Sequence, residues 1–103
     1  MKSSIQLIAT LAAVLLSPNV FANADLAMKK NCMACHAVDK KLVGPAYKAV
    51  AAKYVNDKDA ANRLAEKIIK GGSGAWGPVP MPANAQVNPA EAKQLAQWIL
   101  TVK

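Results

Sequence analysis

Cys32, Cys35 and His36 form the strongest chemical signal in the chain, in the run Cys32-Met33-Ala34-Cys35-His36. Two thiols at this spacing, followed directly by a histidine, are the pattern of c-type haem attachment. Each thiol can add to one vinyl group of the same porphyrin, and the imidazole can then bind the iron. His36 is the single histidine of the chain, so no other imidazole competes for this role.

Three other interpretations of the cysteine pair stay open on this evidence. A thioredoxin-type redox site expects a βαβ context, and no stretch of the chain shows the alternation of a half-buried strand. A zinc site would need a fourth ligand beyond two cysteines and one histidine. A structural disulfide is compatible with an exported protein. Haem is favoured over all three because the chain also offers a second ligand for the iron.

That second ligand is Met81, which lies 45 residues after His36 and between Pro80 and Pro82. A thioether is a weak, neutral ligand, so holding it in place must cost little entropy. Flanking prolines reduce the conformational freedom that is lost when the segment is fixed. Packing in the core is the alternative role for a methionine, and we expect that role for Met28. Ligation by sulfur stabilises ferrous iron and raises the reduction potential.

The N-terminal residues have the order of a secretory signal: a basic start, an apolar run over 5–16, and small residues at Ala22 and Ala24. The apolar run is shorter than the roughly 20 residues that cross a bilayer. We therefore expect 1–22 to be a signal peptide that is removed, with cleavage after Ala24 as the alternative. Residues 23–103 then form one exported domain without a stable membrane anchor.

The exported domain has the apolar spacing of several amphipathic helices. Helical spacing covers 47–54, 61–69 and 92–100, and a less regular helix is expected from about residue 25 into the cysteine pair. Asp59 is a candidate cap for the second of these helices, and Gly71 a natural stop. Asn88, Pro89 and Glu91 mark the start of the third as N-cap, first helical position and capping-box partner.

The stretch over 71–84 contains four glycines and three prolines, and we expect no regular structure there. A long ordered loop in a small domain usually has a function. A domain of roughly 80 residues often needs a disulfide, a metal or a covalent cofactor for stability. The expected fold is therefore all-α, with three to four main helices around one covalently bound haem.

The formal charge of the chain is +7, which suits an acidic partner, an anionic membrane surface or nucleic acid. The lysines are scattered and the aromatic residues few, so nucleic-acid binding is not supported. No apolar surface calls for a partner subunit, and we expect a monomer. Association with an acidic redox protein should slow as salt screens the charges.

The chain resembles the short bacterial class I cytochromes c, which are periplasmic electron carriers to nitrite reductase or a terminal oxidase. The similarity covers essentially all of 23–103, most specifically in CMACH, VGPAYKAVAAKY, GAWGPVPMP and AKQLAQWIL. It implies one haem c, one-electron transport without catalysis, and a quinol–cytochrome c reductase as a possible donor. Carried over by position, it makes Cys32 and Cys35 the thioether links, His36 the proximal ligand and Met81 the distal ligand.

The resemblance also implies three supporting contacts. The Pro45 carbonyl would accept the other ring N–H of His36 and fix the orientation of the ring. Trp76 would donate its indole N–H towards a haem propionate, with core packing as its alternative role. Asn84 would lie near the sulfur of Met81 as a polar neighbour.

Some positions depart from the family pattern. Lys67 stands where some members carry an arginine near the propionates. Ala83 replaces a second proline after the ligand methionine, and the loop after Asn84 is a residue longer than in some relatives. Trp98, within the last helix, is expected to pack in the core. The runner-up function is a haem enzyme or ligand sensor with an open distal site, and a third possibility is a haem-free thiol oxidoreductase.

Overall fold

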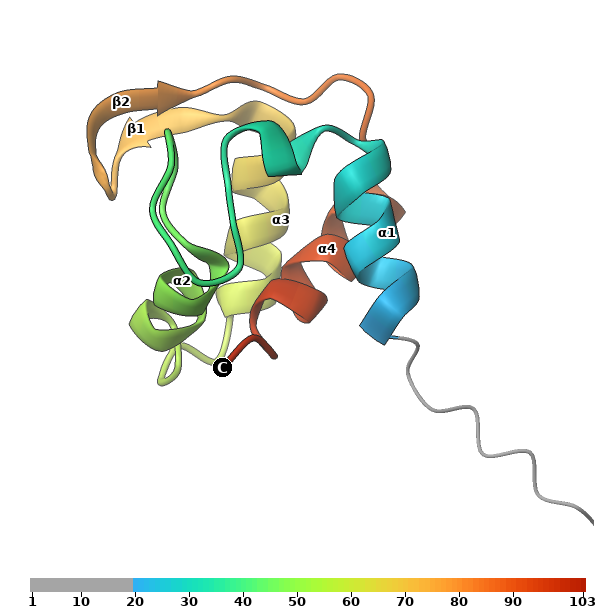
Figure 1. Cartoon of the computed structure of the whole chain (residues 1–103), viewed down its shortest axis with the longest axis horizontal. Coiled ribbons are helices and arrows are strands. Elements are labelled where there is room, and N and C mark those ends of the chain that lie inside the picture. The colour runs from blue at the N-terminus through green and yellow to red at the C-terminus, as the bar shows by residue number, and fades with distance from the viewer. Residues whose placement is uncertain (1–19) are drawn as a thin grey trace, which may run out of the picture.

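The computed structural model describes residues 20–103, so most of the expected signal peptide lies outside the described part. Within that part, the main helices are α1 (Val20–Lys29), α2 (Tyr47–Lys53), α3 (Ala60–Lys70) and α4 (Pro89–Ile99). A short 3-10 helix, η1 (Cys32–Ala34), follows α1, and two short strands, β1 (Gly72–Gly74) and β2 (Gly77–Met81), lie between α3 and α4. The mostly helical architecture agrees with the all-α prediction (Figure 1).

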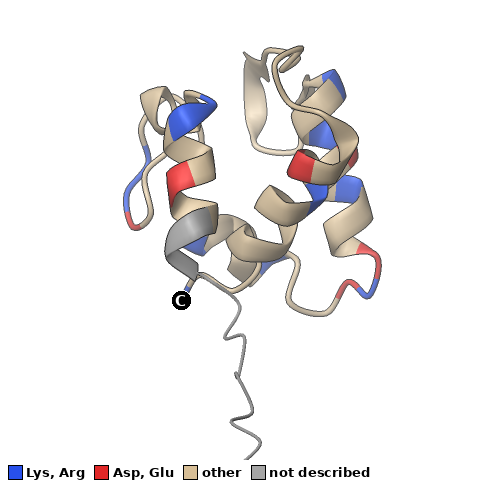
Figure 2. Cartoon of the chain, turned by 90° about the vertical axis from the view of Figure 1, so that its right-hand side faces the viewer, with Lys and Arg blue, Asp and Glu red and all other residues tan. Residues whose placement is uncertain are grey.

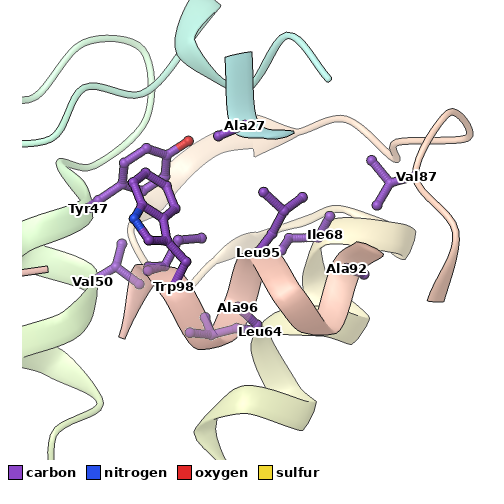
Figure 3. Close-up of a cluster of buried hydrophobic side chains, with 11 residues drawn as sticks. Ala27, Tyr47, Val50, Leu64, Ile68, Val87, Ala92, Leu95, Ala96 and Trp98 are labelled. Atoms are coloured by element: carbon purple, nitrogen blue, oxygen red, sulfur yellow. The ribbon is translucent and has the colours of Figure 1, made fainter. Parts of the chain in front are cut away.

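Helix α4 is the central element of the fold, because it packs against α1, α2 and α3. Its buried face includes Leu95 and Trp98, which are 1% and 6% exposed. The rings of Trp98 and Tyr47 meet edge to face, with centroids 5.2 Å apart and an interplanar angle of 69° (Figure 3). The prediction that Trp98 packs in the core is confirmed.

The three helices with clear apolar spacing are present, and the start of α4 is the best defined. The side chain of Asn88 accepts a hydrogen bond from the Glu91 backbone N–H at 2.8 Å. The Glu91 carboxylate in turn accepts one from the Asn88 backbone N–H at 3.1 Å. This is the predicted capping box. Asp59 occupies the N-cap position of α3 without a side-chain capping bond, and its carboxylate instead accepts from the side chain of Asn62.

Helix α1 differs from the prediction at both of its ends. It begins at Val20 rather than near residue 25, and it ends at Lys29 before the cysteine pair. Asn31 follows in the left-handed region, with φ of 64°, a conformation that asparagine tolerates better than most residues. Met28 is 62% exposed, so the expectation that it packs in the core is wrong. Ala27, one residue earlier, is fully buried instead.

The glycine- and proline-rich stretch is not wholly irregular, which corrects the prediction for 71–84. Strands β1 and β2 form an antiparallel hairpin in which Gly72 pairs with Met81 and Gly74 with Gly77. In Figure 1 this hairpin arches over the top of α3. It places Met81 at the end of β2.

Basic residues are distributed over several elements rather than gathered on one (Figure 2). The scattered lysines of the sequence therefore stay scattered in the fold. Among the described residues, no helix is long and apolar enough to cross a membrane.

Candidate functional site

A cavity of about 610 Å³ opens between the cysteine turn, α2, α3 and the hairpin. Its volume lies within the range of roughly 300–1,000 Å³ that is usual for ligand and cofactor sites, and its lining is mostly apolar. Every candidate site residue from the sequence contributes to the wall: Cys32, Cys35, His36, Pro45, Trp76, Met81 and Asn84. The structure thus brings together residues that are up to 52 positions apart.

Helix η1 turns both cysteines towards this cavity. Cys32 begins the helix and Cys35 caps it, and both are free, half-buried thiols. Desolvation raises the pKa of the Cys32 thiol, so this sulfur stays protonated more readily than an exposed thiol. The structural-disulfide interpretation is not supported. Among the described residues, no group of three or more His, Cys, Asp or Glu side chains could hold a metal ion, and zinc is not supported either.

His36 is held by a hydrogen bond at its edge, by a stacked ring and by the close approach of Gly44. Its Nδ1 lies 2.8 Å from the Pro45 carbonyl oxygen, and because a carbonyl can only accept, Nδ1 carries the proton. The ring stacks on Tyr47 with centroids 5.2 Å apart and an interplanar angle of 21°. A Cβ added to Gly44 would overlap Cε1 of the imidazole and lie 2.8 Å from Nδ1. These contacts fix the ring and leave Nε2 as the nitrogen that can bind a metal.

Met81 reaches the cavity from the end of β2 and packs partly against the core. Asn84 follows on the same wall. Its side-chain amide donates to the carbonyl of Ile68 at 2.8 Å and to that of Pro82 at 3.3 Å. Asn84 therefore ties the backbone after Met81 to the end of α3.

Trp76 lies at the tip of the hairpin and is 44% exposed, so core packing is not its role. The ammonium of Lys53 lies 4.5 Å from the centroid of the Trp76 ring, a cation–π contact. Lys53 also donates to the Ala75 carbonyl at 2.7 Å. These two contacts tie the hairpin tip to the end of α2. Lys67 contributes to the wall as well.

Sequence reasoning missed three contributors to this site. Tyr47 was assigned only to the apolar stripe of a helix, although its ring supports His36. Lys53 is one of many scattered lysines, and Gly44 was not singled out from the sequence. None of the three is marked by its residue type, because each acquires its role from a neighbour that the fold brings close. The sequence VGPAYK does place Gly44, Pro45 and Tyr47 within four residues, which was the one available hint.

The donor set fits a covalently bound haem. Two free thiols, an imidazole with one nitrogen unoccupied and a thioether all face one mostly apolar cavity. The absence of a Cβ at Gly44 leaves the room that the imidazole occupies. An apolar wall of this kind also excludes water from a redox centre, which influences its potential.

Comparison with known proteins gives the family. The sequence pattern of the Cytochrome c family matches residues 22–103. The chain is 55% identical over 92 residues to cytochrome c-552 of Nitrosomonas europaea, covering 89% of each chain. It is 60% identical over 92 residues to cytochrome c-552 of Hydrogenobacter thermophilus, covering 89% of this chain and 93% of that one.

A solved structure agrees with the sequence comparisons. The crystal structure of wild-type Nitrosomonas europaea cytochrome c552 superposes with a TM-score of 0.76 at 60% identity, over 78% of this chain and 99% of that one. The fold, the cysteine pair and the relatives lead to one conclusion. This chain belongs to the cytochrome c family, as a small class I cytochrome that carries one covalent haem c and transfers electrons rather than catalysing a reaction.

Proposed function

We propose that this protein is a periplasmic one-electron carrier whose haem iron is bound by His36 and Met81. The observation that carries the proposal is that Cys32, Cys35, His36 and Met81 all line one cavity. Cys32 and Cys35 would hold the haem through thioether bonds, and the haem supplies the ferric/ferrous couple. The chain's own residues would then determine which side chains bind the iron and which partner proteins can approach the haem.

The contacts of His36 support its role as the proximal ligand. The hydrogen bond from Nδ1 to the Pro45 carbonyl keeps Nε2 free of a proton, and it makes the imidazole a stronger donor to a metal. Stacking on the buried ring of Tyr47 restricts rotation. A ligand held in this way needs little rearrangement when the iron changes its charge.

The setting of Met81 supports its role as the distal ligand. Its backbone pairs with Gly72 in the hairpin, and the following residues are tied to α3 through Asn84. With His36 and Met81 both bound to it, the iron would have no open position for a substrate. This arrangement favours electron transfer over the alternative of a haem enzyme or ligand sensor.

The rim of the cavity suggests where a partner docks. Val43 and Val79 line the cavity yet are 59% and 62% exposed, so they mark its mouth. Lys40 and Lys41, both exposed, also belong to the cavity wall. An apolar rim with adjacent lysines suits a redox protein that presents an apolar patch among acidic residues.

The physiological partners follow from the family resemblance. A quinol–cytochrome c reductase is the proposed donor, and nitrite reductase or a terminal oxidase the proposed acceptor. Residues 1–22 would direct export and be removed. The match of the family pattern from residue 22 onwards is compatible with that boundary.

Replacing Met81 with alanine tests the ligation. We expect Met81→Ala to lose the sulfur-to-iron charge-transfer band of the ferric protein and to lower the midpoint potential, because a soft donor that favours ferrous iron is removed. Absorption spectra and a redox titration measure both effects. Met28→Ala, at an exposed methionine, is the matched control and should change neither.

Two results would contradict the proposal. One is a Met81→Ala protein whose visible bands and midpoint match those of the wild type. The other is rapid binding of carbon monoxide to the native ferrous protein, which would indicate an open distal site.

A further inference from the structure

The segment between β2 and α4 leaves Met81 and crosses to the C-terminal end of α1 (Figure 1). Gln86 lies in this segment, and Lys30 follows α1 two residues before Cys32. Both residues contribute to the cavity wall. The turn that carries the cysteines and the segment that follows Met81 therefore meet at this pair.

Gln86 and Lys30 are joined by two reciprocal hydrogen bonds across 56 residues of sequence. The Gln86 side-chain amide donates to the Lys30 carbonyl at 3.1 Å. The Lys30 ammonium donates to the Gln86 carbonyl at 2.9 Å. Each bond joins the side chain of one residue to the backbone carbonyl of the other. The pair therefore couples the two chain segments and not only their side chains.

Gln86 also connects to the residues next to Met81. Its amide donates a second hydrogen bond, at 3.1 Å, to the side-chain oxygen of Asn84. The side-chain amide of Asn84 in turn donates hydrogen bonds to the carbonyls of Pro82 and Ile68. Both hydrogens of the Gln86 amide and both of the Asn84 amide are thereby directed to acceptors.

Lys30 is itself fixed by a further contact. Its ammonium lies 3.2 Å from Oε2 of Glu91, and both side chains are largely shielded, at 23% and 24% exposed. Glu91 belongs to the capping box of α4. Lys30, which contacts Gln86, is therefore anchored to two helices, α1 and α4.

We propose that Gln86 is a positioning residue that holds the Met81 segment against the cysteine turn and so keeps the Met81 sulfur at the iron. The inference rests on the proposed ligation by Met81 and goes beyond it. Without the Gln86 amide, the segment after Met81 keeps its attachment to α3 but loses its bonds to the Lys30 carbonyl and to Asn84. Only the bond from the Lys30 ammonium to the Gln86 carbonyl then joins this segment to the cysteine turn. The sulfur then leaves the iron more often, and the vacated position becomes available to an added ligand.

Imidazole binding to the ferric haem protein measures this directly, since imidazole must displace the sulfur. We expect Gln86→Ala to bind imidazole about five- to tenfold more tightly than the wild type, as the loss of two modest hydrogen bonds implies. The sulfur-to-iron band should also disappear at a lower temperature. Gln97→Ala, at an exposed glutamine of α4, is the matched control and should stay within twofold of the wild type.

A second variant separates the amide from the bulk of the side chain. Gln86→Leu keeps most of the volume but cannot donate, and should tighten imidazole binding in the same direction. If both Gln86 variants bind imidazole as the control does, the inference is overturned. If the wild type itself shows no sulfur-to-iron band, the proposed ligation fails instead, so the two failures are distinguishable.

Discussion

At the level of single residues, Gly71 controls how closely the hairpin can approach α3. Its φ is +68°, and a Cβ at this position would overlap the carbonyl oxygen of Met81 and lie 2.7 Å from the Ala83 nitrogen. Gly74 also has a positive φ, of +105°, but a Cβ there would meet no atom within 4 Å. The two glycines share a backbone requirement and differ in what surrounds them.

This difference allows a matched test of how Met81 is placed. Gly74→Ala should cost about 1–3 kcal/mol of unfolding free energy, because alanine is strained at such φ values. Gly71→Ala should cost about 1–3 kcal/mol more, since the backbone at Met81 must also move, and it should weaken the sulfur-to-iron band. Denaturant unfolding and absorption spectra measure the two effects. Equal losses in both variants, with the band intact, would show that the contact at Gly71 does not position Met81.

The sequence predicted the haem-binding residues better than the residues that hold them in place. Cys32, Cys35 and His36 are recognisable because attachment to haem requires that spacing. Met81 is recognisable because the prolines on either side of it restrict the conformation of its backbone. The contacts of Gln86 with Lys30 had no such signal, because they join residues 56 positions apart through amides and carbonyls that any sequence contains. Chemically specialised residues can be found from their types, whereas common residues acquire a role only through the fold.

At the level of elements, the three helices with clear apolar spacing were predictable, whereas the bounds of α1 and the hairpin were not. Helix α4 combines apolar spacing with a complete capping box, so local and tertiary preferences agree. The hairpin forms although Pro78 and Pro80 lie in β2, between the paired residues Gly77 and Met81. A two-stranded sheet leaves one edge of each strand without a partner, and proline is tolerated there. Composition alone therefore understated the order of this segment.

The capping box of α4 predicts a pH dependence of stability. A hydrogen bond from the Asn88 backbone, assisted by Lys30, lowers the pKa of Glu91. A carboxyl group with a lower pKa in the folded state stabilises the fold above its unfolded pKa of about 4.3. That stabilisation is lost as the pH falls through the folded-state value. We expect Glu91→Gln to reduce the acid-dependent loss of unfolding free energy, measured by denaturant unfolding across pH.

Glu66→Gln is the comparison for this experiment. The pKa of Glu66 is also lowered, but by hydrogen bonding and charge from Lys70 in an exposed ion pair. Such a pair is screened at about 1 M salt, where the Debye length is near 3 Å. The effect of Glu91→Gln on the pH dependence should therefore survive high salt, and that of Glu66→Gln should fade. A Glu91→Gln protein with an unchanged pH profile would contradict the role of the box.

At the level of the whole molecule, the side-chain core is thin. Of the fourteen buried apolar residues in the part of the chain that the structure describes, six are alanines, and Leu95 is the largest side chain there that is less than 2% exposed. Alanine contributes little apolar area, so the helices gain little from packing on one another alone. A cavity of about 610 Å³ occupies the space between η1, α2, α3 and the hairpin, where a domain of ordinary composition would place its core.

The haem is therefore expected to complete the core as well as carry the electron. We predict that the double variant Cys32→Ala/Cys35→Ala, purified without haem, is largely unfolded: the cavity wall exposes apolar surface that the remaining contacts do not offset. Far-UV circular dichroism should show low helicity and no cooperative melt. Added haemin should restore helicity in proportion to its binding, because the cavity needs the porphyrin and not the thioether bonds as such. A cooperative, native-like melt of the haem-free variant would mean that α4 and its three neighbouring helices form a sufficient core without the porphyrin.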